Sequence, residues 1–225
     1  MRMQNIISRA LSVISRPTVD LPAITQQTES HCGPAVLQMA FQFLGKQFTQ
    51  DDVAGAAQVK KRIMKHGTRP DHLIKAVKKL TPEFQFWFKH PGSIEDLAVL
   101  IHKYHWPVIV NWQGLFYDTL EEEMVYNPDG EHGHYSVVVD VDLNNDKIII
   151  SDPYPDFAKH YRTFSLKWFE TRWWDVDHVE GKKTKKTVPH YTNKLLFIIT
   201  SADEEFPSEI GMLPPEQFKM LRTKK

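Results

Sequence analysis

The first half of the chain is dominated by segments in which apolar residues recur at intervals of three and four positions. Such spacing places the apolar side chains on one face of an α-helix. It predicts helices over residues 32–44, 48–59, 71–80 and 94–104. The segment 84–88, rich in phenylalanine and partly alternating with polar residues, predicts a strand between the last two helices.

The second half of the chain has the pattern of β-structure. A continuous run of β-branched residues within 107–112 is typical of a buried strand. Segments 134–141 and 147–152, joined by an Asn-Asn-Asp turn, predict a β-hairpin. A last strand is expected over 195–200, and a short aromatic-rich helix over 164–174. Because most helices precede the strands, the pattern predicts an α+β fold with an antiparallel sheet.

The pattern divides the chain into three parts. Residues 1–25 are expected to form an N-terminal amphipathic helix, over 1–15, and an approach loop. Residues 26–200 form the main domain, and residues 201–225 a charged, proline-containing tail that is at most partly ordered. Within the main domain, the polar segments 113–133 and 180–187 are expected to be long loops, where substrate specificity could reside.

Composition narrows the range of functions. The 225 residues contain 28 basic and 28 acidic side chains, so bulk charge does not support nucleic-acid binding. A single cysteine excludes an internal disulfide and a cysteine-based zinc site, and it suits a reducing cytoplasm. No cofactor, metal or particular oligomeric state is indicated. No apolar run is long enough to span a bilayer. The first nineteen residues carry three arginines and no acid, which leaves organelle targeting as an alternative.

The only cysteine, Cys32, stands where the chain changes from a polar segment to a helical one. Pro34 suits the first turn of a helix, and Gly45 follows its last apolar residue as a helix-ending glycine. Cys32 is therefore predicted at the N-terminus of a buried helix, where unpaired backbone N–H groups stabilise a thiolate. A small buried cysteine that only fills space is the simpler interpretation. The polar lead-in and Gly33 favour a reactive thiol.

A cysteine nucleophile needs donors that hold the oxyanion formed during attack on a carbonyl. Gln26 lies six residues before Cys32, and its amide could donate together with the Cys32 backbone N–H. Gln27 is a rival for this role, at a less suitable spacing. These residues predict a candidate oxyanion hole on the approach to the helix.

The nucleophile also needs a base and a group that orients the base. Among eleven histidines, His134 is the best placed, because it opens an apolar strand after a glycine-containing segment. The predicted hairpin brings Asp152 to the same end of the sheet, where its carboxylate can accept from the imidazole. Taken singly, a strand-end histidine and an Asp-Pro turn have simpler structural interpretations. Together with Cys32 and Gln26 they predict a catalytic arrangement.

The motifs that carry these residues resemble a known family. They read Gln26-x5-Cys32-Gly33-Pro34-Ala35-x-Leu37-x-Met39, Gly133-His134-Tyr135 and Ser151-Asp152-Pro153. This pattern is similar to the papain-like cysteine peptidases of the bacteriocin-processing (double-glycine leader) peptidase family, in particular to their stand-alone C39-like branch. The similarity extends more loosely over residues 26–175. The resemblance implies a papain-like fold, in which an N-terminal helical half carrying the nucleophile helix packs on a C-terminal antiparallel sheet.

The resemblance also implies roles for the four residues. Cys32 would be the nucleophile, His134 the general base and acid, Asp152 its orienting carboxylate, and Gln26 the oxyanion donor. The expected activity is a cysteine-dependent hydrolase acting on a peptide or protein, or on a small amide. Unlike the exporters of this family, the chain shows neither membrane spans nor a Walker motif, so cleavage coupled to export is not implied. Acyl transfer, as in transglutaminase- or phytochelatin-synthase-like enzymes, and a catalytically silent binding module are the alternatives.

Overall fold

The computed structural model describes residues 17–116, 125, 132–180, 187–204 and 210–218. Its helical elements are α1 (Cys32–Phe43), α2 (Gln50–Ala56), α3 (Ile63–His66), α4 (Pro70–Leu80), α5 (Ile94–His102), α7 (Leu166–Arg172) and the 3₁₀ turn η2 (Pro215–Gln217). Its strands are β1 (Phe84–Lys89), β2 (Val108–Gln113), β3 (Gly133–Asp142), β4 (Lys147–Ser151), β5 (Tyr161–Phe164), β6 (Trp174–Glu180), β7 (Thr187–Asn193) and β8 (Leu196–Ser201). The expected helix over 1–15 and most of the loops 113–133 and 180–187 lie outside the described residues.

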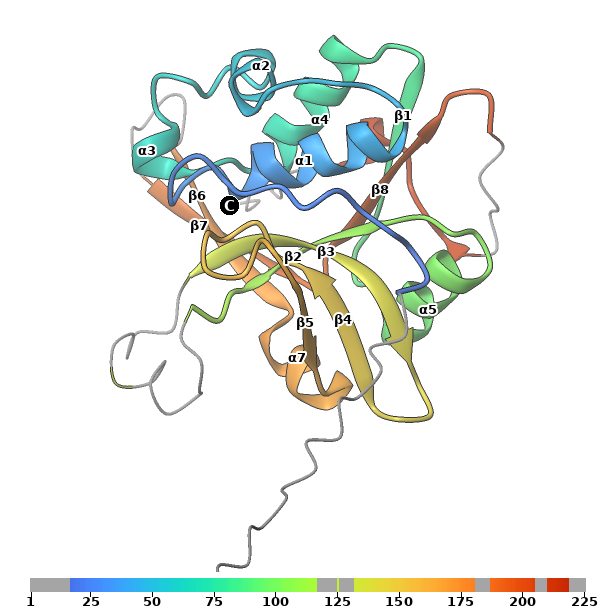
Figure 1. Ribbon diagram of the computed structural model, residues 1–225. Helices are drawn as coiled ribbons and strands as arrows, with labels where there is room; N and C mark the ends of the chain where they lie inside the picture. The colour runs from blue at the N-terminus through green and yellow to red at the C-terminus, as the bar shows by residue number, and fades with distance from the viewer. Residues whose placement is uncertain (1–16, 117–124, 126–131, 181–186, 205–209, 219–225) are drawn as a thin grey trace, which may run out of the picture.

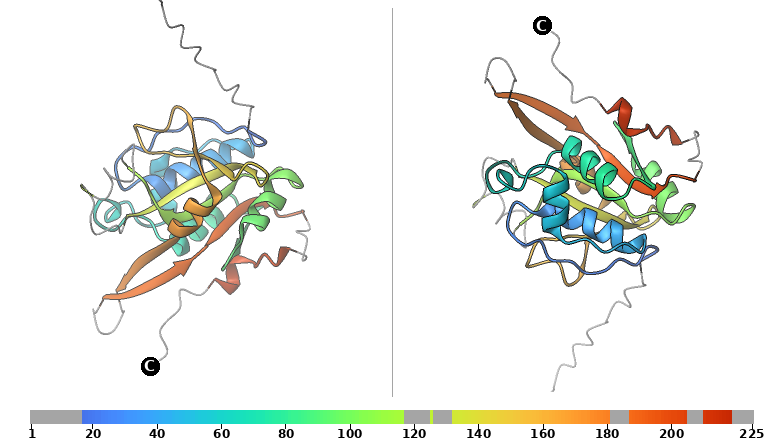
Figure 2. Two further views of the ribbon diagram at one scale, coloured as in Figure 1. Left: turned by 90° about the horizontal axis from the view of Figure 1, so that it is seen from below. Right: turned by 90° about the horizontal axis from the view of Figure 1, so that it is seen from above.

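Six strands form one sheet in the order β1-β8-β2-β3-β4-β5, and every neighbouring pair is antiparallel. The last strand of the chain, β8, lies between β1 and β2, so the two halves of the sequence share this sheet. Strands β6 and β7 form a separate two-stranded hairpin. Figure 2 shows this hairpin extending away from the body of the molecule.

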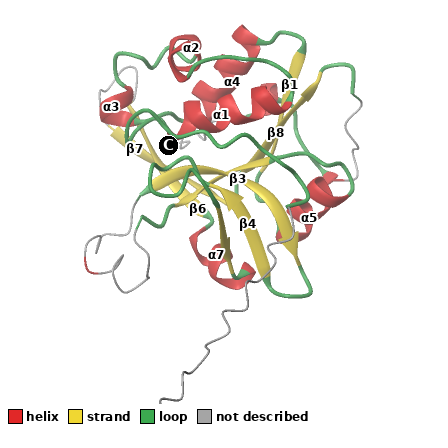
Figure 3. Cartoon of the chain, viewed as in Figure 1, coloured by secondary structure: helices red, strands yellow, loops and turns green. Residues whose placement is uncertain are grey.

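The helices lie on both sides of the six-stranded sheet. Helices α1, α2 and α4 gather above it in Figure 1, and α5 and α7 lie below it. Figure 3, coloured by secondary structure, shows the same separation of helices and strands. This is the α+β architecture that the order of patterns predicts, and it is a papain-like fold. None of the described helices is long and apolar enough to cross a membrane.

Helix α1 is the central packing element because most of its surface is buried. Nine of its residues are buried, among them Val36, Leu37 and Met39. Its C-terminal end is followed by Gly45 in a positive-φ conformation (+75°), which glycine adopts without strain. Helix α2 begins at a capping box in which the side chains of Thr49 and Asp52 each accept from the other residue's backbone N–H.

The aromatic-rich segment 164–174 is a correction to the sequence prediction. Its helix covers only Leu166–Arg172, since Phe164 ends β5 and Trp174 begins β6. Trp112 of β2 contacts Phe164, Trp168 and Phe169, with ring centroids 5.5–6.4 Å apart. The aromatic residues of this segment therefore pack on Trp112 from two consecutive elements, β5 and α7.

Both ends of the described chain contact the sheet region. The Val19 backbone N–H donates to the Val139 carbonyl oxygen at 3.1 Å. In the tail, Leu213 and Phe88 exchange two backbone hydrogen bonds of 3.0 and 2.7 Å, and Phe218 packs edge-on against the Phe88 ring. Within the tail, residues Leu213 and Phe218 thus contact the outer strand β1.

Candidate active site

The structure places Cys32 as the first residue of α1, with His31 as the N-cap. The side chain is buried, and the following residue, Gly33, lies against the loop before α4. A Cβ atom at Gly33 would come within 2.9 Å of the Thr68 Cβ atom, so glycine permits this close approach. The position of Cys32 is therefore fixed by helix α1 and by the segment around Thr68, which packs against the first turn of that helix.

His134 and Asp152 meet at the opening of β3 and the end of β4. Pairing of Val137 with Ser151 aligns these two strands, and His134 Nε2 lies 2.7 Å from Asp152 Oδ1. Both side chains are buried. The hydrogen bond engages Nε2, so the other ring nitrogen, Nδ1, is left to face Cys32, whose side chain lies close enough to raise the pKa of His134. The structure thus brings Cys32, His134 and Asp152 together.

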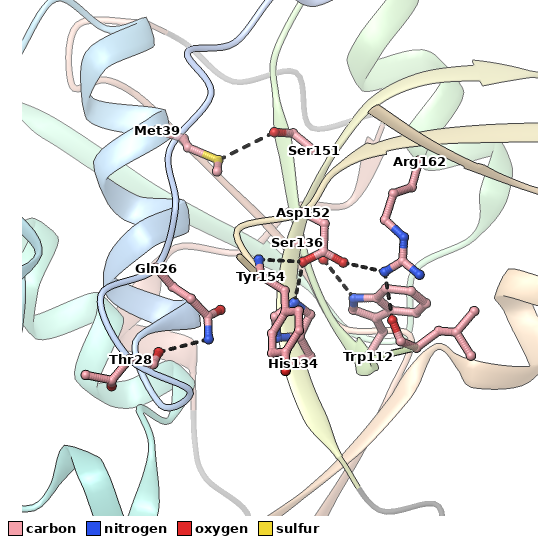
Figure 4. Close-up of polar contacts among 11 residues, drawn as sticks. Gln26, Thr28, Met39, Trp112, His134, Ser136, Ser151, Asp152, Tyr154 and Arg162 are labelled. Atoms are coloured by element: carbon pink, nitrogen blue, oxygen red, sulfur yellow. Dashed lines mark hydrogen bonds and ion pairs between the residues drawn. The ribbon is translucent and has the colours of Figure 1, made fainter. Parts of the chain in front are cut away.

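The Asp152 carboxylate is held by three donors (Figure 4). Besides His134, its Oδ1 accepts from the Tyr154 backbone N–H at 3.0 Å, and its Oδ2 accepts from Arg162 Nη1 at 2.8 Å. Burial alone would raise the pKa of Asp152, but the charges and hydrogen bonds of His134 and Arg162 and the Tyr154 backbone N–H hold it below its usual value. Asp152 is therefore an anion that faces the imidazole.

Arg162 of β5 is a site residue that the sequence prediction missed. Its Nη1 also donates to the Leu115 carbonyl oxygen at 2.8 Å, and its guanidinium lies 3.6 Å from the centre of the Phe157 ring. These contacts fix a buried positive charge next to Asp152. The sequence gives only a slight signal for this role, which is an arginine between the aromatic residues Tyr161 and Phe164. Strand β5 buries this arginine.

The imidazole of His134 is favoured in its charged form. Burial opposes that form, but the negative charge and hydrogen bond of Asp152, and the interaction with Cys32, raise the pKa of His134 to about 10. The Phe116 ring lies edge-on at 5.2 Å between centroids and covers one side of the imidazole. An imidazolium held between a carboxylate and a thiol is the arrangement that stabilises a thiolate.

Gln26 is buried, at 3% exposure, whereas the neighbouring Gln27 is exposed. The Gln26 backbone N–H donates to the Pro153 carbonyl oxygen at 2.8 Å, which joins the approach loop to the residue after Asp152. Its side-chain Nε2 donates to the Thr28 carbonyl oxygen at 2.9 Å, and the second hydrogen of that amide remains available. Figure 4 shows this amide on the side of Gln26 that faces His134.

The approach loop is braced by Gln50 of α2, a second residue that sequence reasoning missed. Gln50 Oε1 accepts from the Gln27 backbone N–H at 2.8 Å, and its Nε2 donates to the Thr25 carbonyl oxygen at 2.9 Å. The buried Gln50 side chain therefore holds the backbone on either side of Gln26. No motif signals this role, because it depends on a contact between segments 23 or more residues apart.

The fold is that of the papain-like cysteine peptidases. Residues 18–179 match the family described as "Peptidase_C39 like family", and the chain belongs to that family of cysteine peptidase-like enzymes. A comparison with curated proteins finds no significant match.

Two solved structures show the same fold. One is the peptidase domain of Streptococcus ComA, a bifunctional ABC transporter involved in a quorum-sensing pathway, with a TM-score of 0.51, 19% identity, and coverage of 80% of this chain and 97% of that one. The other is a double-glycine-motif protease from an AMS/PCAT transporter in complex with the leader peptide, with a TM-score of 0.51 and 14% identity. The match covers 84% of this chain and 96% of that chain.

Proposed function

We propose that this protein is a cysteine-dependent peptidase or amidohydrolase whose nucleophile is Cys32. The observation that carries the proposal is the buried hydrogen bond between His134 and Asp152, with Cys32 close enough to His134 to raise the pKa of the imidazole. A peptide substrate is supported by the family and by the leader peptide bound to one structural neighbour. The single cysteine suits a reducing compartment, and we propose a cytoplasmic location.

In this mechanism the Cys32 thiolate attacks the carbonyl carbon of the scissile amide. The negative charge that develops on the carbonyl oxygen is held by the Cys32 backbone N–H and the Gln26 amide. The His134 imidazolium donates its proton to the leaving amine as the C–N bond breaks, which leaves a thioester on Cys32. Neutral His134 then takes a proton from water, the resulting hydroxide attacks the thioester, and the carboxylic acid and the thiolate–imidazolium pair are released.

Asp152 supports both halves of this cycle without exchanging a proton. Its hydrogen bond to Nε2 fixes the ring so that Nδ1 is presented to Cys32, and its charge stabilises the imidazolium. Arg162 keeps Asp152 ionised within a buried site. We therefore assign Arg162 as a positioning residue that acts through Asp152.

The test is the rate at which iodoacetamide alkylates Cys32, measured from acidic to alkaline pH in wild type and His134→Ala. Since the chain has one cysteine, the label reports on one site. We expect fast labelling well below the pKa of about 8.5 of an ordinary thiol, and loss of that labelling in His134→Ala. Slow labelling with one inflection near about 8.5 in both proteins would contradict the proposal and favour a binding module on the same fold.

Hydrolysis and acyl transfer share the thioester and differ in what attacks it. After acylation of Cys32 by p-nitrophenyl acetate, hydrolysis predicts that acetate is released at a rate independent of added amine. An acyl transferase would instead form the acetylated amine in proportion to amine concentration. The Cys32→Ala variant, which should fold but not be acylated, is the control for reaction at other side chains.

A further inference from the structure

The short helix α3 and the residues around it carry a concentration of positive charge. The segment 53–70 contains five lysine and arginine residues and no aspartate or glutamate. The chain as a whole has equal numbers of basic and acidic side chains, so this segment departs from its average. Three of the five cations, Lys61, Arg62 and Lys65, are exposed and are here called the basic patch.

The lysines of the basic patch differ from the other cations of this segment in having no acidic partner. Lys60 lies 2.9 Å from Asp51, and Arg69 lies 3.0 Å from Asp71, so these two cations are paired. The two lysines of the basic patch form no ion pair with any acid in the described part of the chain. Their charges are therefore directed to solvent.

The third member of the basic patch, Arg62, contacts a neutral partner. Its Nη2 atom lies 2.6 Å from His72 Nε2. Burial lowers the pKa of His72 to about 4, so the imidazole carries no charge at neutral pH. Glu29, on the approach loop, is exposed and forms no ion pair with the patch among the described side chains. Three cations against this one acid leave the region positively charged.

Helix α3 lies beside the segment that leads to Cys32. Ser30 Oγ, on the approach loop, donates to the Met64 carbonyl oxygen at 3.3 Å. After α3 the chain turns at Gly67, which has a positive φ of +57°, and continues to Thr68, which packs against the first turn of α1. Figure 1 shows α3 next to the approach loop and the N-terminal end of α1. The basic patch therefore lies on one border of the active site.

The same helix presents an apolar side chain among these cations. Ile63 is 2% exposed and belongs to the hydrophobic core, which anchors α3. The next residue, Met64, is 64% exposed. A methionine side chain is flexible and adapts to apolar groups of different shape. The exposed surface of α3 thus offers both positive charge and an apolar contact.

The position of the basic patch defines the chemistry of its ligand. Exposed ammonium and guanidinium groups bind carboxylates through charge-assisted hydrogen bonds. Lys65 is three residues before Thr68, so at most about 10 Å of chain separates the two. An extended peptide advances about 3.3 Å per residue. A peptide with its scissile carbonyl at Cys32 would therefore reach the patch with a residue roughly two to five positions away.

We propose that the basic patch and Met64 form a substrate subsite that recognises an acidic side chain of the peptide near its scissile bond. The lysine ammonium groups and the Arg62 guanidinium would donate to the carboxylate, and Met64 would contact the aliphatic part of the same side chain. Nucleic acid is disfavoured as the ligand, because the chain has no net charge and the patch adjoins the candidate nucleophile. This inference rests on the proposed function.

The experiment compares peptide reagents that alkylate Cys32 and differ in one charge. One series consists of acetylated alanine peptides that end in glycyl chloromethyl ketone and so extend to the amino side of the reactive carbon. The other consists of iodoacetyl alanine peptides with an amidated end, which extend to the carboxyl side. Each pair has glutamate or glutamine at one position, placed in turn from two to five residues away.

The second-order rate constant is measured for every reagent in three proteins. They are wild type, the double variant Lys61→Gln/Lys65→Gln, and the matched control Lys78→Gln/Lys79→Gln, which removes two exposed charges from α4. The result for each pair is the ratio of the glutamate rate to the glutamine rate on the same protein. Effects of a substitution on folding or on the thiol itself cancel in this ratio.

We expect glutamate to react about three- to ten-fold faster than glutamine in wild type, at one or two positions of one series, as for exposed cations acting together. The series that shows the preference identifies the side of the scissile bond. In the double variant the ratio should fall to within about two-fold, and in the control it should stay at the wild-type value. High salt should also reduce the wild-type ratio, because it screens exposed charges.

Four results would overturn the subsite. Equal rates within every pair in wild type would show that no acidic side chain is recognised. A preference that survives the double variant would place the recognition elsewhere, and one that the control also loses would reflect overall charge. Equal rates combined with RNA binding that the double variant loses would assign the patch to nucleic acid. Failure of the proposed function is distinct, because Cys32 would then react slowly with all reagents and without dependence on His134.

Discussion

At the level of single residues, the Asp152 carboxylate carries the organisation of the site. It is buried, it accepts from His134, Arg162 and the Tyr154 backbone, and each of these contacts is 3.0 Å or shorter. A carboxylate held in this way keeps the imidazole charged and oriented. We therefore expect the reactivity of Cys32 to depend on Arg162, whose effect would reach the imidazole through Asp152.

Arg162→Met is expected to alter both stability and the pH dependence of the thiol. Removing one partner of a buried ion pair costs roughly 3 kcal/mol of unfolding free energy. It should also raise the pKa of Asp152, since Arg162 lowers that pKa. In a plot of the rate of Cys32 alkylation by iodoacetamide against pH, the acidic limb should then move to higher pH. Lys159→Met, an exposed change in the segment just before β5, is the control. A destabilised variant with an unmoved acidic limb would show that Arg162 is only structural.

Gln26→Ala is expected to separate acylation from alkylation. Loss of one oxyanion donor typically lowers the rate of attack on a carbonyl by about 10²–10³-fold. The rate of Cys32 acylation by p-nitrophenyl acetate should fall accordingly. Alkylation by iodoacetamide forms no oxyanion, so its rate should stay near that of wild type. Gln27→Ala, at the exposed neighbouring residue, should leave both rates unchanged. A parallel loss of both reactions would indicate that Gln26 only shapes the loop.

At the level of elements, a glycine of helix α1 and a glycine of helix α2 differ in the space around them. In α1, a Cβ atom at Gly33 would lie 2.9 Å from Thr68 and 3.3 Å from Leu73. In α2, a Cβ atom at Gly55 would have no neighbouring atom within 4 Å. Gly33→Ala should therefore lower the free energy of unfolding by roughly 1–3 kcal/mol through overpacking. Gly55→Ala should raise it by up to about 1 kcal/mol.

Urea unfolding of the two variants measures this contrast. The Gly55→Ala variant is the internal control for the general effect of alanine in a helix. Gly33→Ala should also slow alkylation of Cys32, because the first turn of α1 has to move away from Thr68. Equal stability of the two variants would mean that the Thr68 segment yields without cost and that Gly33 does not fix the nucleophile.

Local patterns were sufficient to predict the helix that carries Cys32 and the β3–β4 hairpin. Both are encoded within short stretches: a helical repeat after Cys32, and two apolar strands around residues 144–146. Strand β7 could not be found in this way. It contains Pro189, and its two buried positions are the polar residues His190 and Thr192, so it lacks the apolar alternation that marks a strand. Its partner β6 was hidden for the same reason, since Asp175 and Asp177 face inward.

The contacts that support the site are less predictable than its residues. Arg162 and Gln50 act through partners that are distant in sequence, and neither belongs to a motif. Their burial follows from the packing of whole elements against one another. A charged or amide side chain is ordinarily exposed, so sequence alone favours the wrong environment for both. The hydrophobic pattern of the sequence therefore predicts the fold, whereas the side chains that support the site can be identified only in the structure.

At the level of the whole molecule, the position of β8 joins the two halves of the chain. This last strand lies between β1 from the helical half and β2 from the β half. Ile109 and Val110 of β2 pair with Phe197 and Leu196, and β1 pairs along the full length of β8. The sheet under α1 is thus complete only when the C-terminal strand is in place. The order of elements along the chain does not reveal this insertion.

The buried charges of the site also couple its protonation to the stability of the whole fold. The pKa of His134 rises from 6.5 to about 10 on folding, so its contribution to stability is fully present below pH 6.5 and lost as pH rises toward about 10. The pKa of Asp152 is lowered from 3.8, so its contribution is present above pH 3.8 and lost as pH falls through its folded value. Below about pH 8.5, the proton that His134 gains on folding is offset by the proton that Cys32 loses as a thiolate in the proposed pair. Urea unfolding of wild type should therefore show falling stability only above about pH 8.5 and up to about pH 10. His134→Gln, which cannot be protonated, should lack that decline, whereas His160→Gln at an exposed position should retain it. Parallel curves for wild type and His134→Gln would mean that the imidazole is not charged in the folded protein, and the thiolate–imidazolium pair would have no basis.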